Sequence, residues 1–156
     1  MTTDSLSPLA RRVAATQEIV DGWRDRPFVW GTADCARLAA AMLTRLGWKP
    51  GLARGGYYKS ALGAAKAFRR AGFADAAEWM DDVGLLRIPP AAALPGDILG
   101  FGHPDQATRV GLSIAVGNTR AFGFFEAADG VARCNVFAPK MAQPSVEYLA
   151  WRADPR

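Results

Sequence analysis

The sequence predicts an α+β fold in which helices come first along the chain and an antiparallel sheet follows. Up to about residue 84, apolar residues recur at helical spacing between residues that begin or end helices. After that point, short stretches alternate apolar with small or polar residues, and turn signals such as Asp129-Gly130 separate them. Helices followed by a run of strands are typical of α+β domains.

The helical part begins at Ser7-Pro8, and each expected helix has a capping residue at its start or a breaker at its end. Asp34 and Ser60 are expected to cap the second and third helices, and Asp75 and Glu78 have capping-box spacing for a short fourth one. The expected helices span 8–26, 35–46, 61–71 and 76 to about 84.

The second half contains short strand patterns. The clearest is Val110–Val116, in which every second residue is apolar. The expected extended segments are 85–88, 98–101, 110–116, 120–126, 131–137 and 146–151, with the last one closing the sheet.

The bulk composition indicates one globular domain over residues 1–156, with 1–7 expected as a flexible tail. Half of the 156 residues are hydrophobic and 22% are charged. No apolar run approaches the roughly 18 residues of a membrane span, and the polar start lacks a signal-peptide core. We therefore expect synthesis in the cytoplasm. The net charge of +4 suits an anionic partner but also occurs in proteins without one.

Cys35 is the candidate nucleophile. It stands at or next to the first position of a helix, where the helix dipole favours negative charge and lowers a thiol pKa. Asp34 is interpreted as the helix cap beside it, and its negative charge would oppose formation of the thiolate. A nucleophilic cysteine needs a base, and His103 is the one histidine of the chain. The alternative is that Cys35 is a small buried residue without a chemical role.

The remaining cysteine, Cys134, is interpreted as a packing residue. It lies about 100 residues from Cys35, forms no zinc spacing with His103, and a disulfide is disfavoured in the cytoplasm. We expect neither a metal nor a cofactor.

Several motifs then follow one another in a set order. They are Phe28-Val29-Trp30-Gly31-Thr32-Ala33-Asp34-Cys35, Gly55–Ser60, Pro95-Gly96-Asp97-Ile98, Val110-Gly111 and Ala150-Trp151-Arg152. Over roughly residues 8–152 the chain resembles the NlpC/P60 superfamily of papain-like cysteine peptidases, and more narrowly the compact phage and prophage proteins of the DUF6950 family. The resemblance implies a papain-like fold, with Cys35 on the central helix facing a small antiparallel sheet.

The chain departs from the superfamily pattern at the expected base. NlpC/P60 enzymes carry a histidine just before the Val-Gly pair and a third polar residue on the next strand. Arg109 occupies the expected base position here, and the next strand offers Arg120-Ala121-Phe122-Gly123-Phe124. An arginine stays protonated and cannot take a proton from a thiol. Arg109 is an exposed strand-end residue, a positive neighbour of a thiolate, or the ion-pair partner of Asp34 or Asp97.

Two functions follow from the resemblance. The first is a phage or prophage virion component near the tail tip or hub, built on a catalytically degenerate scaffold. It would be made in the bacterial cytoplasm, incorporated into a particle, and bound to other tail or hub proteins. The alternative is an active cysteine peptidase that cleaves peptidoglycan stem peptides, with Cys35 as nucleophile and His103 as relocated base. A third possibility is a module that binds wall peptides without cutting them.

Two further groups of residues have open interpretations. One group forms a basic side of the third helix, which is either a solvated face, the interpretation we favour, or a surface for an anionic polymer: Lys59, Lys66, Arg69 and Arg70. We expect no nucleic-acid partner. The other group is aromatic and either lines a groove or belongs to the core: Trp30, Trp48, Tyr57 and Tyr58.

Overall fold

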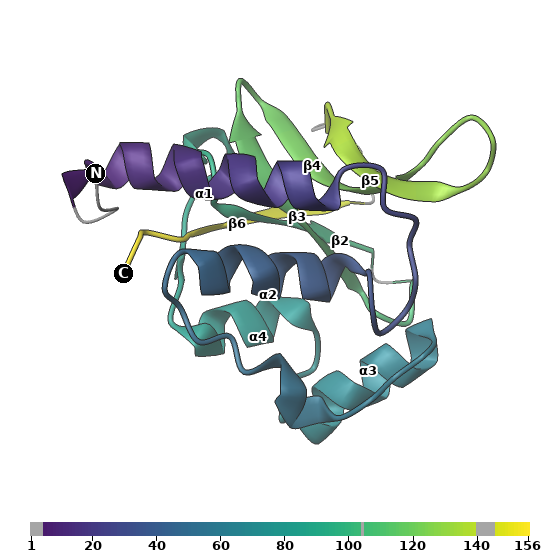
Figure 1. Cartoon of the computed structure of the whole chain (residues 1–156). Helices are drawn as coiled ribbons and strands as arrows, with labels where there is room; N and C mark the ends of the chain where they lie inside the picture. Colours follow the sequence, from purple (N-terminus) through teal and green to yellow (C-terminus); the bar gives the residue numbers. More distant parts are fainter. Residues whose placement is uncertain (1–4, 104, 140–145) are drawn as a thin grey trace.

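The computed structural model describes residues 5–103, 105–139 and 146–156, and it packs a layer of helices on one face of an antiparallel sheet (Figure 1). The α+β prediction is confirmed. The helices are α1 (Pro8–Trp23), α2 (Cys35–Arg45), α3 (Ala61–Arg70) and α4 (Ala76–Val83), with the short 3₁₀ turns η2 (Leu52–Gly55) and η3 (Pro90–Ala92).

The strands are β1 (Leu86–Arg87), β2 (Ile98–Gly102), β3 (Val110–Gly117), β4 (Arg120–Glu126), β5 (Ala132–Phe137) and β6 (Glu147–Arg152). Their order in the sheet is β1-β6-β2-β3-β4-β5, and neighbouring strands run antiparallel. The strand β6 thus lies between β1 and β2, with Trp151 opposite Ile98.

The helix starts follow from the caps that the sequence contains. The side chain of Ser7 accepts a hydrogen bond from the N–H of Ala10, and Asp34, Ser60 and Asp75 cap α2, α3 and α4 in the same way. These caps satisfy backbone donors that have no partner within the helix. The expected helix starts are therefore confirmed. Residues 1–4 of the expected tail lie outside the described residues.

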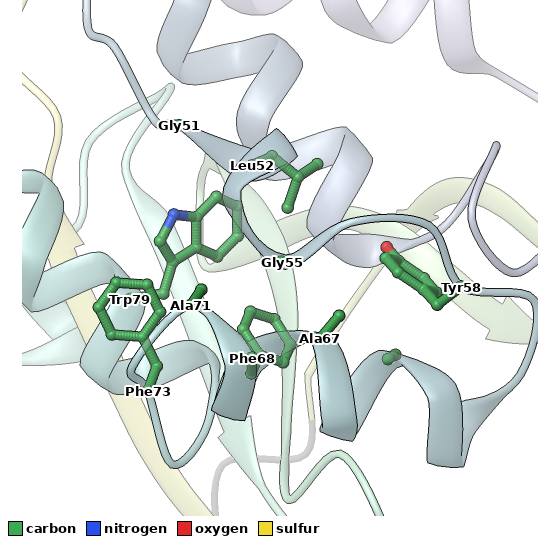
Figure 2. Close-up of a pocket in the computed structure, with 10 residues that line it drawn as sticks. Gly51, Leu52, Gly55, Tyr58, Ala67, Phe68, Ala71, Phe73 and Trp79 are labelled. Atoms are coloured by element: carbon green, nitrogen blue, oxygen red, sulfur yellow. The ribbon is translucent and has the colours of Figure 1, made fainter.

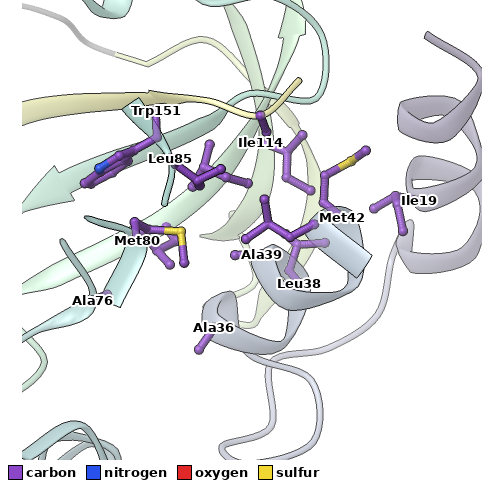
Figure 3. Close-up of a cluster of buried hydrophobic side chains, with 14 of the residues drawn as sticks. Ile19, Ala36, Leu38, Ala39, Met42, Ala76, Met80, Leu85, Ile114 and Trp151 are labelled. Carbon is purple, nitrogen blue, oxygen red and sulfur yellow. The ribbon is translucent and has the colours of Figure 1, made fainter. Parts of the chain in front are cut away.

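The helix α2 is the centre of the core. Its buried residues Leu38, Ala39 and Met42 face Ile114 of β3 and Trp151 of β6, and α4 adds further apolar side chains (Figure 3). Small alanines along α2 allow this close packing. The alternation of β3 sends Leu112 and Ile114 into the same core, while Ala115 packs on the opposite face of the sheet.

The chain between α1 and α2 covers the outer edge of β5. Here α1 ends at Trp23, earlier than the expected stop at Pro27, because residues 25–28 turn to pair with β5. Cys134 accepts a hydrogen bond from the N–H of Asp25 and donates its own N–H to Arg26. The segment thereby occupies backbone groups of Ala132 and Cys134 that could otherwise pair with a further strand.

A buried ionic cluster joins α1 to the start of β2 and to the end of β6. Asp97 is fully buried and accepts hydrogen bonds from Arg12 at 2.7 Å and from Arg152 at 3.0 Å. Its two oxygens also accept the backbone N–H groups of Leu94 and Ala153. Asp97 therefore fixes the start of β2 and the end of β6 against α1.

Within the described ranges, no helix combines the length and the apolar character that crossing a membrane requires.

Candidate functional site

Asp34 fixes the start of the helix that carries Cys35. The carboxylate is 1% exposed, and its Oδ1 accepts a hydrogen bond of 2.9 Å from the N–H of Arg37. Its Oδ2 accepts the N–H of Gly31 at 2.8 Å and the hydroxyl of Tyr58 at 2.7 Å. Asp34 therefore caps α2 and is itself held in place by Gly31 and Tyr58.

The turn before α2 requires glycine at position 31. Gly31 has a φ of +83°, and a Cβ at this position would lie 2.1 Å from the carbonyl oxygen of Tyr58. The segment around Tyr58 therefore packs directly on the turn. This contact and the Tyr58–Asp34 hydrogen bond together set the position of Cys35, which follows at the first residue of α2.

The side chain of Cys35 is protonated at neutral pH. Burial and, to a smaller extent, the negative charge of Asp34 raise the pKa of this thiol to about 11, although the backbone N–H of Leu112 acts in the opposite direction. Desolvation thus outweighs the helix start, which alone would lower a thiol pKa. Both cysteines are free, and Cys134 lies in the core, where burial raises its pKa to about 12.

Cys35 and His103 line the same groove, which has a volume of about 480 Å³. The groove lies where the start of α2 meets the β2–β3 and β4–β5 ends of the sheet. Its walls are rich in aromatic side chains: Phe28, Trp30, Phe101, Phe124, Phe125, Phe137 and Tyr148. Among the described residues that line it, none is Asp, Glu, Lys or Arg. The groove is therefore largely apolar and carries no fixed charge from these residues.

His103 reaches the groove but does not bond to the thiol. It follows β2, and its backbone N–H donates to the carbonyl of Arg109 across the turn to β3. The hydrogen bonds found among the described residues include none between the imidazole and Cys35. The structure therefore brings the two residues to one groove without forming a cysteine–histidine pair.

Arg109 lies on the surface at the end of the β2–β3 turn. It is exposed, has a φ of +59°, and is absent from the described lining of the groove. The interpretations that pair it with Asp34 or Asp97 are wrong. Asp34 is held by backbone N–H groups and Tyr58, and Asp97 is held by Arg12 and Arg152.

The next strand supplies no polar orienting residue. Within the stretch expected to provide one, Phe122 belongs to the core, Phe124 lines the groove and Arg120 is exposed at the other end of β4. A base that is held in place by a third group is the usual arrangement in cysteine hydrolases. The described residues contain no such arrangement around Cys35.

Sequence reasoning missed two groups of the groove that belong to β3. These are the backbone N–H of Leu112, which acts to lower the pKa of the thiol, and Ser113, a residue of the groove lining. The alternating pattern of β3 placed Ser113 on one face of a strand. The same pattern does not indicate that the side chain of Ser113 is buried.

The four aromatic residues that were expected either to line a groove or to belong to the core differ in their positions. Trp30 lines the groove, whereas Trp48 and Tyr58 are buried and Tyr57 is 85% exposed. The basic residues on α3 and just before it are all exposed: Lys59, Lys66, Arg69 and Arg70. Arg70 also donates a hydrogen bond from Nε to the carbonyl of Gly55.

A second, much smaller cavity lies between α3, η2 and Trp79 (Figure 2). Its volume is about 20 Å³, and side chains such as Phe68 and Phe73 make its lining apolar. A cavity of this size has room for about one water molecule, and an apolar lining keeps it dry. It is a packing gap. The described side chains also form no cluster of three or more His, Cys, Asp or Glu that could hold a metal ion.

Comparison with known proteins places the chain in a family. Among solved structures it is similar to the P60 domain of antigen MAP1204 from M. avium subspecies paratuberculosis. That similarity has a TM-score of 0.48 and 13% sequence identity, and covers 92% of this chain and 96% of that one. No curated protein matches the chain. Residues 9–142 match the family described as a domain of unknown function, DUF6950. Since this match spans most of the sequence, the chain belongs to the DUF6950 family.

Proposed function

We propose that this chain is a non-catalytic interaction module on an NlpC/P60-like scaffold. The observation that carries the proposal is the state of Cys35, whose thiol has a pKa raised to about 11 and no base bonded to it among the described residues. Cysteine hydrolysis needs a thiolate, a base that can return the proton to the leaving group, and a group that orients the base.

Cys35 and the residues around it do not meet these requirements. With a pKa of about 11, only about one thiol in ten thousand is ionised at pH 7. Arg109 stands on the surface and keeps its proton, so it cannot act as the base. The strand that would orient a base contributes Phe124 to the groove. The remaining feature of the site is the groove, whose aromatic side chains are suited to binding a partner molecule.

A peptidoglycan digestion tests the absence of catalysis. The purified protein would be incubated with isolated cell walls and with soluble muropeptides between pH 5 and 9, and the products would be separated by mass spectrometry. We expect no stem-peptide fragments above the level of the Cys35→Ala variant. Fragments that appear with the wild type and disappear in Cys35→Ala would contradict the proposal.

We further propose that the module works in a phage or prophage particle, near the tail tip or hub, after synthesis in the bacterial cytoplasm. The support is the sequence resemblance to phage and prophage proteins of this family. The expected partners are tail hub and distal tail proteins. Particles purified on a density gradient should contain the chain in a fixed ratio to the hub protein. Recovery of the chain only at the top of the gradient, free of particles, would contradict this location.

The second candidate function is a cysteine peptidase that acts on stem peptides, with His103 as the base. The observation in its favour is that Cys35 and His103 line one groove. It predicts that His103→Ala and Cys35→Ala each abolish wall digestion. The digestion described above separates the two candidates.

A further inference from the structure

We propose that a cavity on the face of the sheet opposite α2 binds a single-chain amphiphile of the fatty-acid type, with a hydrocarbon tail and one negative charge at its end. The cavity has a volume of about 340 Å³, and neither Cys35 nor His103 is among its described lining residues. It shares a wall with the groove, formed by Phe101, Pro139 and Tyr148. The inference therefore goes beyond the proposed function and adds a second binding site to the scaffold.

The floor of the cavity consists of small side chains. Leu99 of β2 and Ala115 of β3 line it, and they belong to an apolar cluster on this face together with Ala121 and Ala150. At three of these four positions a methyl group is the whole side chain, so little side-chain volume stands above the sheet here. The space that a larger residue would fill is left open to a ligand.

The walls of the cavity are held in place by contacts within the protein. Phe101 and Tyr148 line it, and their rings meet edge to face with 5.4 Å between the centroids. The turn η3 lines it through Pro90 and Ala91, and Arg152 donates a 2.8 Å hydrogen bond to a carbonyl of η3. Because these walls are already ordered, a ligand would not have to order them on binding.

The lining offers few groups to a ligand with a polar body. Its described side-chain hydroxyls belong to Thr119 and Tyr148, and Thr119 already donates to the carbonyl of Asn118. The backbone of β2 is paired with β3 on one side and with β6 on the other. A peptide in this cavity would bury amide groups without partners, whereas a hydrocarbon chain has no polar group to desolvate. The lining therefore favours a hydrocarbon tail.

Arg120 supplies the charge of the described lining. It begins β4 and is exposed, and its side chain forms no hydrogen bond or ion pair with other described residues. A guanidinium on a long, exposed side chain can turn toward an anion at the rim and bind a carboxylate through two N–H groups. No residue of the described lining is an Asp or a Glu. The charge of the lining thus matches a ligand with a single anionic head group.

The volume of the cavity sets the length of the tail. A methylene group is about as large as a water molecule, whose share of liquid volume is about 30 Å³, so the cavity holds a chain of roughly ten carbons. Decanoate is therefore the fatty acid that we choose as the probe.

A comparison of decanoate with related compounds tests the proposal. The ¹⁵N-labelled protein would be titrated below micellar concentrations with decanoate, decan-1-ol, decyltrimethylammonium, butanoate and the peptide acetyl-Val-Val-Leu with its carboxylate free. We expect decanoate to bind and to shift the amide resonances of Ala115 and Arg120, while those of Cys35 and Leu112 stay in place. The uncharged alcohol should bind at least three-fold more weakly than decanoate. The cation, the short acid and the peptide should each bind at least ten-fold more weakly.

Two pairs of variants locate the site. Arg120→Gln should weaken decanoate binding five- to ten-fold and leave the binding of decan-1-ol unchanged. Arg109→Gln, which alters an exposed arginine outside the described lining, should change neither. Ala93→Trp places an indole in the lining and should weaken both ligands at least ten-fold. Its neighbour Ala92 is exposed and is not among the described lining residues, so Ala92→Trp is the matched control.

The proposal is overturned if decanoate does not bind, if the cation or the peptide binds as tightly as decanoate, or if Arg120→Gln binds decanoate like Arg109→Gln. Shifts confined to Cys35 and Leu112 would place the amphiphile in the groove and would also overturn it. Wild-type affinity of a folded Ala93→Trp would exclude the cavity. The wall digestion measures catalysis separately, so none of these results decides the proposed function.

Discussion

The hydroxyl of Tyr58 donates a 2.7 Å hydrogen bond to Oδ2 of Asp34, the carboxylate that caps the helix carrying Cys35. The two residues are 24 positions apart in the sequence. Tyr58 is buried, so the bond is formed away from water. Burial and this bond together raise the pKa of the Tyr58 hydroxyl, and it stays protonated as the donor.

Removing this hydroxyl should destabilise the protein. Tyr58→Phe leaves a buried carboxylate with one donor fewer, and a hydrogen bond to a charged group contributes about 2 kcal/mol to the free energy of unfolding. Urea denaturation would measure the loss. The matched control is Tyr57→Phe, since Tyr57 is 85% exposed and should change stability by less than about 0.5 kcal/mol. Equal stability of both variants would contradict the role of the Tyr58 bond.

Removing the charge of Asp34 should lower the pKa of Cys35. The negative carboxylate next to the thiol opposes its ionisation, so Asp34→Asn should move the thiol pKa below its value of about 11. The rate of iodoacetamide alkylation against pH reports this pKa. The control Asp75→Asn changes the cap of α4 and should leave the alkylation profile unchanged. An unaltered profile in Asp34→Asn would show that burial alone sets the pKa.

Stability should fall as the pH rises from about 8.5 to 10. The pKa values of Cys35 and Cys134 are raised to about 11 and about 12, whereas a thiol in the unfolded chain titrates near about 8.5. In this window the unfolded state binds fewer protons than the folded state, so alkaline pH favours unfolding. The slope approaches about 1.4 kcal/mol per pH unit for each thiol.

The variant Cys134→Ala isolates one of these contributions. Its absolute stability will differ from the wild type because the core changes, but the slope of the free energy of unfolding against pH should be about half as steep. Chemical denaturation at several pH values below 10 gives the slope and keeps the titration of ordinary tyrosines out of the window. Parallel slopes for variant and wild type would contradict the raised pKa of Cys134.

Breaking the buried ionic cluster should be the most damaging change. Asp97→Ala leaves Arg12 buried without its principal carboxylate, and removing one partner of a buried ion pair costs about 3–5 kcal/mol. Thermal and urea unfolding would measure it. The control Arg45→Ala removes an exposed pair with Glu18, for which about 0–1 kcal/mol is expected. Similar losses for both variants would contradict the structural role of Asp97.

Local features of the fold could be predicted from the sequence because they depend on neighbouring residues. Ser7, Asp34, Ser60 and Asp75 each cap a helix within three residues of the group they bind. The alternation of β3 likewise needs no partner to be recognised. Cys35 was placed at a helix start on the same grounds.

The site itself depends on contacts between distant segments, which a single sequence does not reveal. Nothing near Tyr58 indicates that it bonds to Asp34, and nothing near Asp97 indicates Arg12 as its partner. Burial of the thiol, which reverses the effect of the helix start on its pKa, follows from the packing of α2 on β3.

The position of β6 has a consequence for synthesis of the protein. This strand lies between β1 and β2, yet it is translated after every other strand of the sheet. On the ribosome, the facing edges of β1 and β2 stay without their native partner until residues 147–152 have left the exit tunnel. Because Ala153 also supplies an N–H to Asp97, the ionic cluster is completed at the same late moment. Completion of the whole sheet therefore depends on the strand that follows all the others along the chain.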